Sequence, residues 1–122
     1  MPEAWTEITD DGTLTEVVGV PLPHVAHKER PRLAPLDRDW LAASTLCVVA
    51  TCDDRGNLDA SPKGDPAGSL VHVLDDHTIA LAERPGNRRV DGYRNVLRNP
   101  TSGSCSLSRD ATTPCVSTAA PA

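Results

Sequence analysis

The chain has 122 residues, a formal net charge of −5 at pH 7 and very few aromatic side chains, with two Trp, one Tyr and no Phe. This length allows at most one ordinary domain, whose core must come almost entirely from Val, Leu, Ile and Ala. The acidic balance argues against general nucleic-acid binding. No apolar run approaches the ~20 residues that span a bilayer, so we expect no membrane partner.

The N-terminus is acidic and lacks the basic start and the apolar stretch of a secretory signal, so we expect a cytoplasmic protein. Its four cysteines, Cys47, Cys52, Cys105 and Cys115, form no CxxC motif and are predicted to be thiols. Cys47 and Cys52 are five positions apart on one predicted strand and would point to opposite faces, so we expect no metal site there.

The first segment, residues 1–35, is rich in proline and has only a short apolar cluster at Leu14, Val17 and Val18. This composition predicts an N-terminal segment that wraps a surface. A short helix is predicted next, over residues 36–44, because Asp37 is a suitable N-cap and is followed by an apolar pair, Trp40 and Leu41.

Four short strands are predicted after this helix, at residues 45–52, 58–62, 69–74 and 78–83. The first is β-rich and apolar, and the turn sequence Asp-Asp-Arg-Gly-Asn that follows it predicts a hairpin. The spacing is typical of an antiparallel meander in a barrel or sandwich rather than of a βαβ fold. We therefore expect a mainly β protein with short helices.

The motif RPGNRR, residues 84–89, lies between the last of these strands and a helix predicted over residues 88–98 with Asn87 as its N-cap. Arginines in the first turn oppose the helix dipole, so another interaction must favour Arg88 and Arg89. A bound anion would satisfy both the free backbone N–H groups and the guanidinium groups, and Lys63 could join them. The alternative is that these arginines form a solvated face.

The sequences DASPKGDPAGS, residues 59–69, and VLDDHTIALAERPGNRRVDGYRNVLRNP, residues 73–100, resemble the pyridoxamine 5′-phosphate oxidase-like, FMN-binding split-barrel family. The closest likeness is to a bacterial subgroup marked by SP(K/R)GD and RPGNRR. The resemblance covers residues 36–100 and implies a partial FMN-binding split-barrel domain there, that is, an incomplete antiparallel split β-barrel. It also implies a homodimer with FMN at the subunit interface.

The resemblance further implies a set of cofactor-binding residues. Arg88 and Arg89 fall where the family holds the FMN phosphate, with Asn87 beside them, and Lys63 is a further phosphate or ring contact. Ser61 and Pro62 lie on the strand whose backbone passes the isoalloxazine ring. No catalytic residue is predicted, and a different flavin or a deazaflavin in place of FMN remains open.

The C-terminal segment, residues 101–122, departs from the family, because it is rich in Ser, Thr and Ala where further barrel strands are expected. Its composition predicts a disordered tail. We hypothesise a frameshift near codon 101, because reading one nucleotide earlier turns serine codons of the TCN class and cysteine codons into codons for apolar residues. The alternative is a natural low-complexity tail.

Three functions follow from these observations. The first is a flavin-dependent oxidoreductase, in which the protein orients FMN and the flavin carries the redox chemistry. The second is a non-catalytic flavin-binding or carrier protein of the same fold. The third is an inactive truncated fragment, because the missing strands would supply much of the dimer interface and part of the pocket. The substrate is not predicted.

Overall fold

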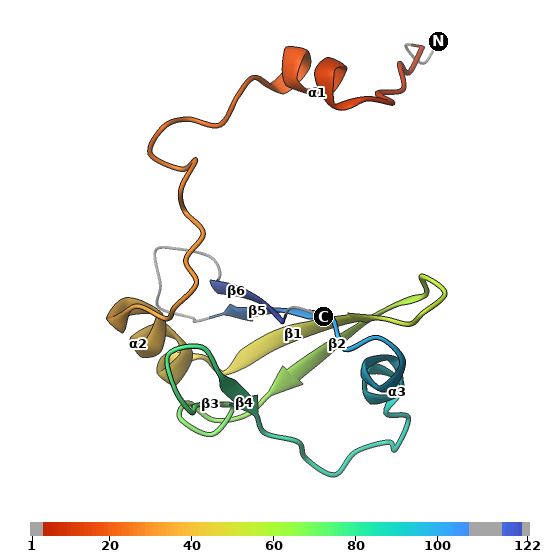
Figure 1. Ribbon diagram of the computed structural model, residues 1–122. Helices are drawn as coiled ribbons and strands as arrows, with labels where there is room; N and C mark the ends of the chain where they lie inside the picture. Colours follow the sequence, from red (N-terminus) through yellow and green to blue (C-terminus); the bar gives the residue numbers. More distant parts are fainter. Residues whose placement is uncertain (1–3, 108–115, 121–122) are drawn as a thin grey trace. The chain divides into compact units, whose positions relative to one another are not determined.

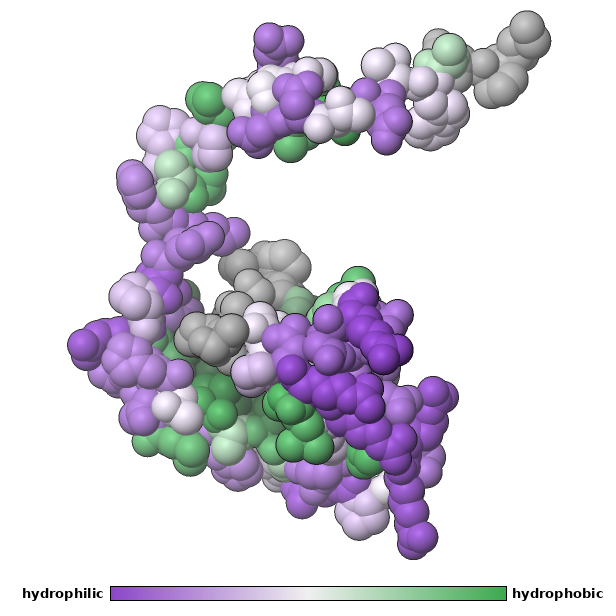
Figure 2. All heavy atoms as spheres, turned by 45° about the vertical axis from the view of Figure 1, so that its right-hand side comes forward, coloured by the Kyte–Doolittle hydropathy of each residue, from purple (hydrophilic) through white to green (hydrophobic). Residues whose placement is uncertain are grey.

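The structure is a computed structural model that describes residues 4–107 and 116–120. The chain divides into two compact units, Met1–Pro31 and Arg32–Ala122. In the first unit, helix α1 (Asp11–Val18) is capped by Asp10, whose carboxylate accepts a hydrogen bond from the Thr13 N–H at 2.8 Å. No residue of α1 is buried, and this unit exposes hydrophobic as well as hydrophilic side chains (Figure 2).

The second unit begins with helix α2 (Pro35–Ala43), close to its predicted position. The sequence predicted Asp37 as the N-cap of this helix, but the N-cap is Ala34. Asp37 lies inside the first turn and accepts a hydrogen bond from the Ala34 N–H at 2.7 Å. The helix starts earlier because proline suits the first helical position, where no N–H is needed. Leu41, on the inner side of α2, is 1% exposed.

Strands β1 (Leu46–Cys52) and β2 (Leu58–Gly64) form the predicted antiparallel hairpin. The turn between them is organised by Asp53, whose carboxylate accepts hydrogen bonds from the N–H groups of Arg55 and Asn57 at 2.8 and 2.9 Å. Gly56 adopts φ +87° there, a conformation that favours glycine. The turn that the sequence predicts is therefore present.

Strands β3 (Val71–Val73) and β4 (Ile79–Leu81) pair with each other in a separate two-stranded sheet (Figure 1). The prediction of one continuous meander is thus wrong, because β3 pairs with β4 but not with β2. The small core joins α2, β1 and β3, and its buried members are Leu41, Cys47, Leu70 and Val71. Partly buried side chains of Leu33, Val49, Val73, Ile79 and Leu81 pack against it.

The C-terminal segment contains two further strands, β5 (Ser102–Leu107) and β6 (Val116–Ala120), which complete a sheet of order β2-β1-β5-β6. The predicted disorder is wrong for these two strands; the remaining tail positions lie outside the described residues. The composition of this segment did not reveal the two strands, because strand pairing uses backbone N–H and C=O groups, which any residue other than proline supplies in full. The second edge of β1 also needs a hydrogen-bonding partner, which β5 provides.

The described elements are thus antiparallel sheets with three short helices, and they form no closed barrel. This confirms the prediction of a mainly β, incomplete antiparallel split barrel. The sequence predicted free thiols at all cysteines. Cys47 and Cys52 are free, as predicted, whereas Cys105 is disulfide-bonded.

Candidate functional site

One face of the four-stranded sheet carries the candidate site. The register pairs Val49 with Ser61 and Thr51 with Asp59, so these side chains share a face. Helix α3 (Asp91–Arg98) packs against β1 and β2 (Figure 1). Asn95, on α3, donates a hydrogen bond to Thr51 Oγ1 at 3.1 Å and so ties the helix to β1.

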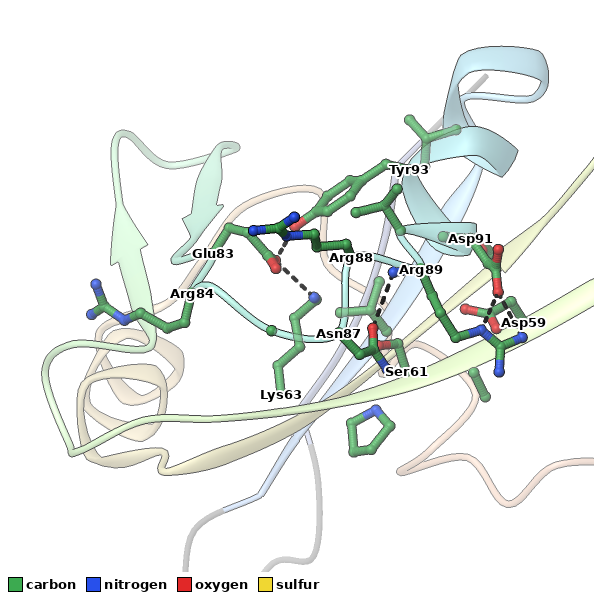
Figure 3. A pocket seen from close by; sticks show the side chains of 18 of the residues that line it. Asp59, Ser61, Lys63, Glu83, Arg84, Asn87, Arg88, Arg89, Asp91 and Tyr93 are labelled. Atoms are coloured by element: carbon green, nitrogen blue, oxygen red, sulfur yellow. Dashed lines mark hydrogen bonds and ion pairs between the residues drawn. The ribbon is translucent and has the colours of Figure 1, made fainter.

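A pocket of about 950 Å³ lies between this face, residues 83–90 and the first turns of α3. Its volume is within the usual range for small-molecule sites. Figure 3 shows the charged side chains that surround it. All six residues that the sequence predicted to bind cofactor line this pocket, namely Ser61, Pro62, Lys63, Asn87, Arg88 and Arg89.

The RPGNRR segment forms a loop rather than the start of a helix. α3 begins at Asp91, and its N-cap is Val90 in the left-handed conformation (φ +48°), without a side-chain cap. Asn87 is therefore not the N-cap; its Oδ1 instead accepts a hydrogen bond from the Arg89 N–H at 3.1 Å within the loop. Arg88 has φ +64°, so two non-glycine residues hold a conformation that is costly for them.

The arginines of this loop differ in their partners. Arg84 binds Asp65, with Nε to Oδ2 at 2.7 Å, and Arg89 binds Asp91, with Nη2 to Oδ2 at 2.9 Å. Arg88, by contrast, forms no ion pair with any residue in the described parts of the chain. The sequence motif treats Arg88 and Arg89 alike, whereas the structure gives only Arg89 a carboxylate partner.

A second charged group in the pocket joins three separate elements. Lys63 on β2 has its Nζ 3.0 Å from Oε2 of Glu83, which follows β4 (Figure 3). The Tyr93 hydroxyl, on α3, donates a hydrogen bond to the same carboxylate oxygen. The Lys63 ammonium also lies 5.3 Å from the centre of the Tyr93 ring, a cation–π distance.

Sequence reasoning missed Glu83 and Tyr93 as pocket residues. From the sequence, Glu83 is only the end of a strand, and Tyr93 is only an apolar position of the helix. The spacing of Lys63, Glu83 and Tyr93 along the chain carries no signal, because their contact depends on how β2, β4 and α3 pack. The one available hint is the position of Glu83 directly before RPGNRR.

These contacts shift the pKa values of all three groups. Hydrogen bonds from Tyr93 and from Lys63 lower the pKa of the Glu83 carboxyl. The hydrogen bond to Glu83, with partial burial, raises the pKa of the Tyr93 hydroxyl. For Lys63, burial acts to lower the pKa, but the hydrogen bond to Glu83 and nearby negative charge outweigh it and raise the pKa. The group is therefore a charged Lys–Glu pair with a neutral tyrosine at neutral pH.

Residues 4–107 and 116–120 hold no arrangement typical of a metal site. No cluster of three or more His, Cys, Asp or Glu side chains in these ranges is placed to hold a metal ion. Within the same ranges, no helix has the length and apolar character needed to cross a membrane.

The described residues form an incomplete antiparallel β-barrel with a pocket lined by cationic and anionic side chains. A family model described as pyridoxamine 5′-phosphate oxidase matches residues 33–108, more than half of the chain. The chain therefore belongs to this family. The match extends past Pro100 and includes β5. No curated protein and no solved structure matches the chain.

Proposed function

We propose that this chain binds FMN in the pocket beside α3. The observation that carries the proposal is the position of Arg88, a guanidinium group without a carboxylate partner among the described residues, beside the uncapped N-terminus of an eight-residue helix. Unpaired N–H groups at a helix N-terminus and a planar guanidinium both suit a phosphate group. Family membership supports a flavin as the molecule that carries this phosphate.

The lining residues fit the rest of the cofactor as well. Val49, Val96 and Tyr93 supply apolar and aromatic surface for a ring system. Strand β2 is at the edge of its sheet, so backbone groups around Ser61 and Pro62 are available on its outer side. A site with an apolar wall and a few polar groups is typical of cofactor binding.

Each predicted residue then has a defined task. Arg88, assisted by Arg89 and the first N–H groups of α3, holds the phosphate. Asn87 shapes the loop through its hydrogen bond to the Arg89 N–H. Ser61 and Pro62 line the ring, and Lys63 donates a hydrogen bond toward it.

We further propose that the protein is a flavin-dependent oxidoreductase. The flavin supplies electron or hydride transfer, and the residues named above bind and orient it and exclude water from one of its sides. Retention of FMN without turnover of a nicotinamide or oxygen would instead favour the carrier function.

A homodimer is part of this proposal. The face of β1 and β2 opposite the pocket is poorly covered: Leu58 is 83% exposed and Leu46 is 40% exposed. Exposed apolar surface of this kind is typical of an interaction site. Size-exclusion chromatography with light scattering tests it, and a monomer at all concentrations would contradict it. A cytoplasmic location is also part of the proposal.

The decisive test is a titration of FMN fluorescence with the 122-residue chain. We expect saturable quenching that is weakened at least about tenfold by the double change Arg88→Ala and Arg89→Ala, because charged hydrogen bonds to phosphate are lost. The matched control is Arg55→Ala with Arg98→Ala, which removes the same charge from exposed residues that do not line the pocket. Equal affinity in the two double variants would refute the site assignment.

A second titration addresses the inactive-fragment alternative. The same measurement is made on a chain whose reading frame is restored after Pro100. If both chains bind FMN, the 122-residue chain suffices for the site. If only the restored chain binds, the 122-residue chain is a fragment of a flavin-binding protein.

A further inference from the structure

Four cations line the pocket, and three of them, Lys63, Arg84 and Arg89, each have a carboxylate partner. Lys63 shares Oε2 of Glu83 with the Tyr93 hydroxyl, at 3.0 Å from its Nζ. Arg88 has no carboxylate partner in the described parts of the chain. The Lys63 side chain is also the more enclosed member of its pair, at 20% exposed against 51% for Glu83.

An anion therefore meets different costs at the two positions. At Lys63 it must displace a carboxylate that is held by two donors from two elements, β2 and α3. At Arg88 it displaces no carboxylate of the described residues. Since Lys63 keeps further N–H groups, it can still donate a hydrogen bond to a neutral acceptor such as a carbonyl oxygen.

We propose that Glu83 is a specificity-determining residue that sets the direction in which a monophosphate ligand lies in the pocket. By neutralising Lys63, Glu83 leaves Arg88 as the position for the phosphate and turns Lys63 into a donor for the uncharged ring. The inference rests on the proposed function where the ligand is FMN. It concerns Glu83 and Tyr93, which the sequence alone does not connect with the site.

The test compares the affinities of FMN and riboflavin, since their ratio isolates the contribution of the phosphate. We expect Arg88→Ala to reduce this ratio roughly tenfold, the loss of a charged hydrogen-bond pair. Adding Glu83→Gln to the Arg88→Ala chain should then raise the ratio again by at least about threefold, because Lys63 no longer has a carboxylate partner. Gln keeps the size of Glu and an oxygen that accepts from Tyr93, so the fold is preserved.

Two controls separate this explanation from a general change of charge. Glu16→Gln combined with Arg88→Ala makes the same change in the N-terminal unit and should recover nothing. Adding Lys63→Gln to the Glu83→Gln, Arg88→Ala chain should abolish the recovery. Recovery with Glu16→Gln, or recovery that survives Lys63→Gln, would overturn the proposal.

Inorganic phosphate provides a test of the role of Glu83 that does not depend on flavin binding. Its stabilisation of the chain in a thermal melt should be lost in Arg88→Ala and regained when Glu83→Gln is added. If no variant binds flavin but phosphate shows this pattern, the proposed function fails and the role of Glu83 stands. If neither the flavin ratio nor phosphate stabilisation recovers, the role of Glu83 is refuted.

Discussion

The two ends of one sheet face are closed in different ways. At the end near Cys47, which is fully buried, α2 and β3 cover the strands with Leu41, Leu70 and Val71. At the other end, beyond Val49, α3 and the RPGNRR loop enclose a pocket lined by charged side chains. The same two strands therefore serve a small apolar core along one part of their length and a polar site along the next.

Because of this difference, we expect substitutions at one end to change the stability of the fold and substitutions at the other end to change ligand binding. Burial of aliphatic side chains stabilises the fold by kilocalories per mole for each residue. Exposed ion pairs such as that of Arg89 with Asp91 contribute little, because water and salt screen them. Changes at the core end should thus lower the free energy of unfolding, whereas changes at the pocket end should act on ligand affinity.

The largest effect on stability is expected from Leu41→Ala. Leu41 is 1% exposed, so its truncation leaves a cavity and should lower the free energy of unfolding by about 2–5 kcal/mol in a urea titration. Leu97→Ala is the matched control, since Leu97 is also helical but 87% exposed and should change stability by less than about 0.5 kcal/mol. Similar losses in both variants would show that the core end is not where we place it.

A smaller loss is expected from Trp40→Phe. The Trp40 Nε1–H donates to the Ser106 carbonyl at 3.0 Å and so connects α2 with β5. Removing this bond should cost about 1 kcal/mol of unfolding free energy. Trp5→Phe is the control, because Trp5 is 96% exposed. Equal stability of the two variants would argue against the docking of β5 beside α2.

At the pocket end, Asp91→Asn should have the opposite sign, with tighter binding. It frees the Arg89 guanidinium from its carboxylate partner, and we expect FMN affinity to rise about threefold, the range of a broken surface ion pair. Asp54→Asn, in the β1–β2 turn, makes the same charge change away from the pocket. Weaker binding in Asp91→Asn would show that the carboxylate itself supports the site.

The smallest expected effect is on the free energy of unfolding that is lost at acidic pH. Because the pKa of Glu83 is lowered in the folded chain, its contribution to stability is complete above its ordinary value near 4.5 and is lost as the pH falls through the folded value. The Tyr93 hydrogen bond is the main cause of this shift, so Tyr93→Phe should reduce the stability lost on acidification. Urea titrations at about pH 6 and about pH 3.5 measure it. An unchanged difference would mean that Tyr93 does not act on Glu83.

The sequence predicted much of the local structure because local chemistry dictates it. The Asp53 turn and the apolar β1 depend on neighbouring residues alone. Element ends were less accurate: α3 starts at Asp91 rather than at residue 88. Asn87 has the chemistry of an N-cap, but the left-handed Arg88 and Val90 turn the chain before the helix begins.

What the sequence determined by itself is strands β1 to β4, helix α2, most of helix α3, the family and the cationic motif, since these are encoded in adjacent residues. Tertiary structure alone decided that β5 pairs with β1, because a serine-rich strand is recruited by an open edge rather than by its own side chains. It also decided that Arg88, unlike Arg89, has no carboxylate partner among the described residues. Lys63 and Glu83 are twenty positions apart and meet only because β2, β4 and α3 converge on one pocket.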